Sequence, residues 1–170
     1  MTAHLLILSF HISCGVVALG LGLVAMWATK QRGLHTIVGN IYHWVFLCLA
    51  VSACGLAALD WSRLWWYVPI AVGSYALALT GFLAAKIRWN GWLETHLSGQ
   101  LGSYIAMITA LLVVNFGTVW WAWVLPTVIG SPIISWLKRE VRAGRRPKYG
   151  PRAPRVPMVQ EEPLQLVSAL

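Results

Sequence analysis

Charged side chains are scarce in this sequence of 170 residues. Lysine, arginine, aspartate and glutamate make up 11% of it, and only five residues are acidic. Because soluble domains carry about a quarter of their residues as charges, this composition excludes an ordinary soluble domain. Hydrophobic residues reach 58%, and the mean hydropathy is +0.67. Both values are typical of a chain embedded in a lipid bilayer.

The motifs of soluble enzymes are missing as well. The sequence has no phosphate-binding loop, no nucleophile elbow and no His-Glu-x-x-His zinc helix. Its three cysteines, Cys14, Cys48 and Cys54, form no Cys-x-x-Cys pair and fall in apolar stretches. We therefore expect them to be small packing residues, not disulfide partners or zinc ligands.

Long apolar runs fill most of the chain. A helix needs roughly 20 apolar residues to cross the hydrocarbon core, and backbone groups in lipid must be bonded internally. The sequence therefore predicts an all-α integral membrane protein, a bundle of five transmembrane helices over residues 1–137. The predicted spans are residues 5–27, 35–59, 65–85, 96–116 and 120–137, of which the fifth is shorter and kinked by its prolines.

Lysine and arginine predict the orientation of these spans. Four basic residues lie in the loops after the first and third spans and eight follow the fifth, so twelve fall on one side and only Arg63 on the other. The positive-inside rule then places the N-terminus outside and the C-terminus in the cytoplasm, in the inner (plasma) membrane. This distribution explains the net charge of +8 without a nucleic-acid partner.

The last segment, residues 138–170, has a different composition. It contains eight basic residues, three acidic residues and five prolines. We expect a disordered cytoplasmic tail that is attracted to anionic lipid headgroups.

Histidines are the residues with the clearest potential for chemistry, because ionisable groups are costly inside a membrane. His35 and His96 lie at the cytoplasmic ends of two spans, at nearly equal depth, so we expect them to face each other. His11 lies about two turns from the outer surface and either serves a second site or lines the bundle. Small residues share helix faces with these histidines, and we expect backbone or a cofactor to approach closely at Gly15, Gly22 and Gly39.

Two stretches carry a resemblance to a known family. The string HISCGVVALGLGLVAMWATKQRGLHTIVGNIYHW and the later HLSGQLGSY resemble the bacterial membrane proteins grouped as "domain of unknown function 2306". The likeness covers residues 8–115, although Thr36 stands where family members commonly have arginine. It implies as site residues His11, Gly15, His35, Gly39, His96 and Tyr104.

The general look of this family is similar to that of transmembrane b-type cytochromes. With the histidine pair, it favours haem b held by His35 and His96 as iron ligands, and electron transfer across the membrane or to a quinone. The expected partners are the lipid bilayer, a quinone or a redox protein, and other membrane subunits or a second copy of the chain.

Other interpretations stay open. The small residues also suit plain helix packing, with His35 and His96 hydrogen-bonded at the membrane surface. The protein would then be a non-catalytic accessory subunit of a larger membrane complex. A small transporter is less favoured, because none of the five acidic residues lies deep in a predicted span.

Overall fold

The computed structural model describes residues 3–30, 33–117 and 119–144, and within these ranges all regular structure is helical. Five helices are long and apolar enough to cross a membrane, which confirms the all-α, multi-pass architecture. A short helix, α3 (Trp61–Leu64), joins two of them. The five long helices are α1 (Ala3–Trp27), α2 (Leu34–Leu59), α4 (Tyr67–Ile87), α5 (Trp92–Phe116) and α6 (Trp120–Arg142).

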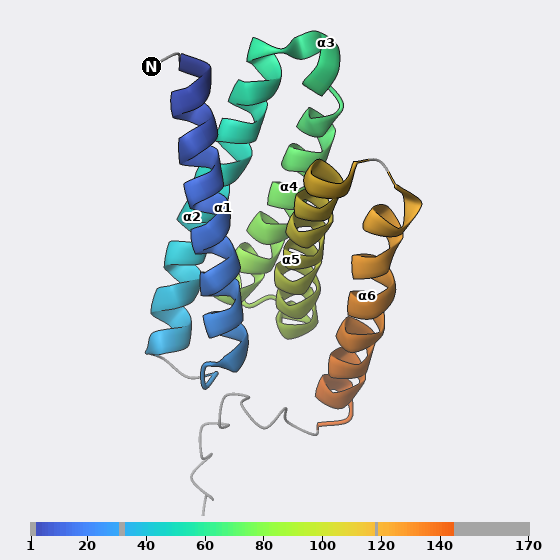
Figure 1. The fold of residues 1–170 in the computed structure, drawn as a ribbon. Coiled ribbons are helices and arrows are strands. Elements are labelled where there is room, and N and C mark those ends of the chain that lie inside the picture. Colours follow the sequence, from blue (N-terminus) through green and yellow to red (C-terminus); the bar gives the residue numbers. More distant parts are fainter. Residues whose placement is uncertain (1–2, 31–32, 118, 145–170) are drawn as a thin grey trace, which may run out of the picture.

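The long helices run alternately up and down, and each packs against the next along the chain (Figure 1). The helices α1, α2, α4 and α5 form the bundle, and α6 packs on α5. A hydrogen bond from the Tyr104 hydroxyl on α5 to the Leu19 carbonyl on α1, 3.1 Å long, links the first and last helices of the bundle. With five alternating helices, residues 3 and 144 lie at opposite ends of the molecule (Figure 1).

Left-handed backbone conformations mark the tight connection between α4 and α5. Arg88 ends α4 with φ 59° and Gly91 precedes α5 with φ 77°. Arginine is unusual in this conformation, which glycine adopts at low cost. Only four residues separate the two helices, so they pack side by side along much of their length.

Two predicted boundaries are wrong. Residues 138–142 were expected to start a disordered tail, but α6 continues without a break to Arg142. The basic residues there sit on a helix whose last turn they suit electrostatically. Likewise, α5 begins at Trp92, four residues before the predicted start. The rest of the predicted tail, residues 145–170, lies outside the described residues.

The core is built from aromatic residues against very small ones. Tyr104 lies flat against Gly22, so closely that any side chain at Gly22 would overlap the tyrosine ring. On the other side of α5, a Cβ at Gly99 would come within 2.6 Å of the backbone nitrogen of Gly81 on α4. Such backbone contact gives transmembrane helices the van der Waals packing that holds them together in lipid.

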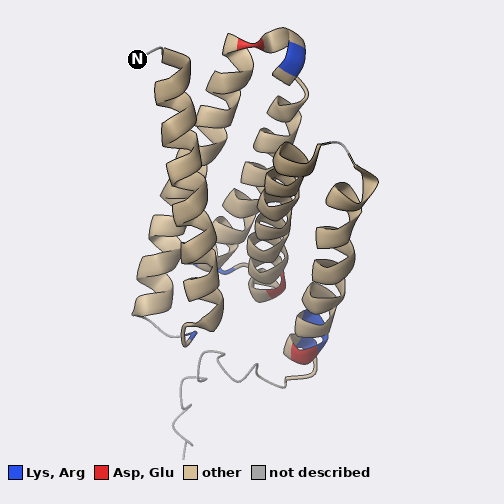
Figure 2. Ribbon diagram, in the orientation of Figure 1, with Lys and Arg blue, Asp and Glu red and all other residues tan. Residues whose placement is uncertain are grey.

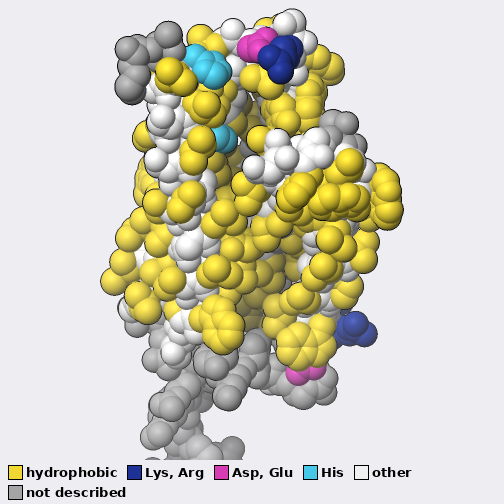
Figure 3. Space-filling model, in the orientation of Figure 1, with side chains coloured by type: hydrophobic (Ala, Val, Ile, Leu, Met, Phe, Trp, Pro, Cys, Tyr) yellow, Lys and Arg dark blue, Asp and Glu magenta, His cyan; other side chains and the backbone are white. Residues whose placement is uncertain are grey.

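Charges gather at the two ends of the bundle (Figure 2). Asp60 and Arg63 lie at the end where α1 begins, and the other described basic residues lie at the opposite end. Between the ends, hydrophobic side chains cover the visible face (Figure 3). This distribution fits a bundle whose middle is surrounded by lipid.

Candidate functional site

The structure brings His35 and His96 together, as their equal depth predicts. His35 lies in the first turn of α2 and His96 in the second turn of α5, both at the end of the bundle that carries most of the basic residues. Their ring centres are 6.2 Å apart, and the ring planes are nearly perpendicular, at 86°. Both side chains are half-buried. Two imidazoles that lie 61 residues apart in the chain thus share one end of the bundle.

Both rings are held in place through the same nitrogen. The Nδ1 atom of His35 lies 3.1 Å from the Ala25 carbonyl, and that of His96 lies 2.9 Å from the Gly81 carbonyl. Because a carbonyl can only accept a hydrogen bond, Nδ1 carries the proton in both histidines. In a neutral imidazole the lone pair is then on Nε2. This arrangement, with Nδ1 donating to a backbone carbonyl, is common among metal-binding histidines.

Close packing of α4 on α5 provides the partner of His96. Gly81 and Gly99 let the two backbones approach, so the Gly81 carbonyl comes within reach of a side chain that starts one turn before Gly99. Gln100 adds a parallel contact, since its amide donates to the Ala78 carbonyl at 2.9 Å. Two side chains of α5 thereby fix its rotation relative to α4.

Lys30 lies near the His35–His96 pair, at the C-terminal end of α1. Its ammonium donates to the carbonyls of Ala25, Met26 and Ala28, at 2.5, 2.8 and 3.0 Å. These carbonyls lie at the C-terminal end of α1, where the helix itself provides no partner, and the Ala25 carbonyl also accepts from His35. The ammonium also lies close enough to His35 and His96 to act on both electrostatically. Burial lowers the pKa of Lys30 from its ordinary value.

The glycines expected to make close contacts behave differently from one another. Gly22 meets the Tyr104 ring as predicted. Gly15 makes only an ordinary contact, since a Cβ there would be 3.7 Å from Leu49. At Gly39 no described atom lies within 4 Å of a Cβ position, so the described residues make no helix contact there, and close approach of a cofactor stays a prediction. Gly39 is one turn from His35 on α2, and it leaves space beside the histidine.

Tyr104 stabilises the packing of α5 against α1. Its hydroxyl donates to the Leu19 carbonyl and its ring covers Gly22, both on α1. Its neighbour in the core, Tyr42, lies 3.4 Å from the fully buried Ser103 hydroxyl. A binding role for Tyr104, implied by the family resemblance, stays a prediction.

His11 is placed away from the pair, in the half of α1 near the other end of the molecule. Its Nδ1 atom is 3.0 Å from the Ser52 hydroxyl on α2. The serine hydroxyl in turn donates to the Leu49 carbonyl at 2.9 Å. His11 therefore lines the α1–α2 contact. A second site there stays a prediction.

His43 is the most deeply buried of the described histidines, at 6% exposure. Its ring stacks on Phe82 of α4, with the ring centres 4.0 Å apart and the planes 8° apart. Its Nδ1 atom has no hydrogen-bond partner among the described residues. Sequence reasoning gave His43 no role, and the structure assigns it to the α2–α4 packing contact.

Sequence reasoning missed Lys30 and Gly81 as parts of the site. The signal for Lys30 was its position three residues after the first span, where a lysine can reach back to free carbonyls. Gly81 contributes through its backbone, and nothing in its side-chain pattern marks that contribution.

The described residues contain no group of three or more His, Cys, Asp or Glu side chains placed to hold a metal ion. The chain thus offers a pair of imidazole ligands here. Comparison with family models, curated proteins and solved structures finds no match to this chain. The resemblance carried by residues 8–115 stays a prediction.

Proposed function

We propose that this protein binds one haem b between His35 and His96 and carries electrons within the membrane, with a lipid-soluble quinone as the exchange partner. The observation that carries the proposal is the pair itself. Two imidazoles on different helices donate from Nδ1 to backbone carbonyls, which puts the lone pair of each neutral ring on Nε2, the atom that would bind the metal.

The donor set fits an iron that already has four ligands. A structural zinc ion needs four protein ligands, whereas haem iron takes four from its macrocycle and leaves two axial positions for the protein. Neutral imidazole nitrogens are suitable axial ligands, and the iron they hold supplies one-electron transfer. The two half-buried histidines provide one such pair.

The spacing of the rings is compatible with this proposal. Bonds of about 2 Å to a shared metal, with each nitrogen about 1.1 Å from its ring centre, put the two ring centres about 6 Å apart. The centres of His35 and His96 are 6.2 Å apart. The open space at Gly39 lies on the same helix, one turn from His35.

The residues around the pair have separate tasks in this proposal. The Ala25 and Gly81 carbonyls orient the rings and keep the proton on Nδ1. Lys30 adds positive charge beside both imidazoles, which favours the reduced, less positive state of the iron. The core residues Tyr42, Phe46 and Met107 keep water from the centre of the bundle.

We further propose that the pair faces the cytoplasm. Lys30, Lys86 and Arg88 lie at the same end as the histidines, and Arg63 lies at the other. By the positive-inside rule this puts the N-terminus outside and the C-terminus inside, in the plasma membrane of a bacterium.

The test is the visible spectrum of the full chain, purified in detergent from cells supplied with a haem precursor. We expect a sharp band on reduction and about one haem per chain, because one axial pair is present. His35→Ala and His96→Ala should each lose the band. His4→Ala and His11→Ala should keep it, since neither lies near the pair.

A wild-type protein that stays colourless would overturn the proposal and favour the accessory-subunit alternative. Retention of the full band by the variant that lacks both His35 and His96 would also overturn it. Elution of each variant as the wild-type species in size-exclusion chromatography separates loss of haem from loss of fold.

A further inference from the structure

A hollow of about 380 Å³ opens where the α4–α5 connection meets the last turn of α6. This volume is within the roughly 300–1,000 Å³ typical of small-ligand pockets. The α4–α5 connection, the start of α5 and the last turn of α6 line it. The lining includes Arg88, Trp89, Asn90, Trp92, Glu94 and Val141. It lies outside the His35–His96 pair and plays no part in the function proposed above.

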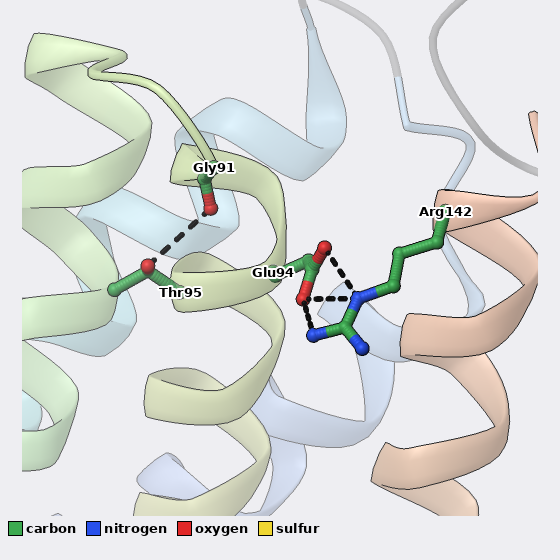
Figure 4. Close-up of polar contacts among 4 residues, drawn as sticks. All are labelled: Gly91, Glu94, Thr95 and Arg142. Atoms are coloured by element: carbon green, nitrogen blue, oxygen red, sulfur yellow. Dashed lines mark hydrogen bonds and ion pairs between the residues drawn. The ribbon is translucent and has the colours of Figure 1, made fainter.

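Among the described residues, Glu94 is the only acid that lines the hollow, and it is paired with an arginine. Arg142 on α6 donates hydrogen bonds from Nε and Nη2 to the carboxylate oxygens of Glu94, with nitrogen–oxygen distances of 2.6 to 3.0 Å (Figure 4). Such bidentate contacts are the strongest arginine–carboxylate pairs. Lys138, one turn earlier on α6, acts electrostatically on the same carboxylate. With Arg88, the named basic side chains around the hollow outnumber its one lining carboxylate.

Arg88, the cation in the lining of the hollow, has no carboxylate partner among the described residues. Its guanidinium carbon lies 5.3 Å from the centre of the Trp92 ring, which holds it over an aromatic face and leaves its donors for another group. Asn90 adds an exposed amide on the same wall. A guanidinium beside an amide is well suited to bind a phosphate.

We propose that this hollow binds the headgroup of an anionic phospholipid, with Arg88 contacting the phosphate. The position of the hollow favours a lipid headgroup over a free anion. The hollow lies where two membrane-crossing helices end, between Trp89 and Trp92, and tryptophans prefer the level of the headgroups. The side chain of Val141 gives it an apolar wall.

Native mass spectrometry of the purified full chain tests this proposal, with phosphatidylglycerol, phosphatidylcholine and inorganic phosphate as separate probes. We expect phosphatidylglycerol adducts on the wild type and much weaker phosphatidylcholine or phosphate adducts. Arg88→Gln should weaken phosphatidylglycerol binding about tenfold, because it removes a charge-assisted contact. Arg88→Lys keeps the charge but loses the planar guanidinium stacked on Trp92, so its binding should lie between those of Arg88→Gln and the wild type.

The matched control is Arg63→Gln, which removes an exposed arginine at the other end of the bundle and should bind like the wild type. Equal phosphatidylglycerol binding by Arg88→Gln and the wild type would overturn the proposal. Phosphate binding as strong as that of the lipid would show a site for a free anion instead. Neither result depends on haem, so the failure of one proposal is distinguishable from that of the other.

Discussion

The histidines of the bundle differ in how their ring nitrogens are satisfied. His11, His35 and His96 each have a partner within 3.1 Å of Nδ1, whereas His43 has none among the described residues. An unpaired polar atom in a buried place costs about 1–3 kcal/mol. The stacking of His43 on Phe82 offsets part of this cost.

A phenylalanine at position 43 should therefore be tolerated. His43→Phe keeps an aromatic ring against Phe82 and removes the unpaired nitrogen, so the free energy of unfolding should rise by about 1 kcal/mol. Unfolding in mixed detergent micelles, followed by tryptophan fluorescence, measures the change. A loss of more than about 2 kcal/mol would mean that Nδ1 of His43 makes a bond on which the fold depends.

Some parts of the helical fold were predictable from the sequence and others were not. The spans were, because about 20 consecutive apolar residues leave few alternatives in lipid. The meeting of His35 and His96 followed from depth alone. The partners of their Nδ1 atoms were not predictable, because they depend on how closely α4 approaches α5. That distance is set by the opposed glycines Gly81 and Gly99, and periodicity does not show which small residues oppose each other.

The contact between α4 and α5 should be the most sensitive in the bundle. Gly99→Leu would push its side chain into the backbone of Gly81 and should destabilise the protein by about 1–3 kcal/mol or prevent assembly. Gly73→Ala on α4 is the matched control, because no described atom lies near its Cβ position and alanine favours helix. Thermal unfolding in detergent compares them. Similar melting temperatures for the two variants would contradict this assignment of the helix contact.

At the scale of the whole molecule, the odd number of long helices puts the ends of the described chain on opposite sides. The basic residues mark one side and Asp60 with Arg63 marks the other. Seen from the bilayer, the protein is an apolar belt between two polar ends, with the histidine pair near the more basic end.

Reporter fusions test the orientation. An alkaline phosphatase fused at the N-terminus should be active, since that enzyme works outside the cytoplasm, and a fluorescent protein fused at the C-terminus should fluoresce in the cytoplasm. The physical reason is the cost of moving the basic loops that contain Lys30, Lys86 and Arg88 across the membrane. Reporters at the two ends that reside on the same side would eliminate a five-span topology.

The pairing of each long helix with the next has a consequence for how the protein is made. A helix that emerges during synthesis finds its partner already in the membrane, so α1 with α2 and α4 with α5 can associate as hairpins before the chain is finished. The hydrogen bond from Tyr104 to Leu19 joins residues 85 positions apart. It cannot form until the first half of α5 has been inserted, which makes it a late step of assembly. The histidine pair depends on the same late arrival of α5, so the site that we propose for haem is completed only when the bundle closes.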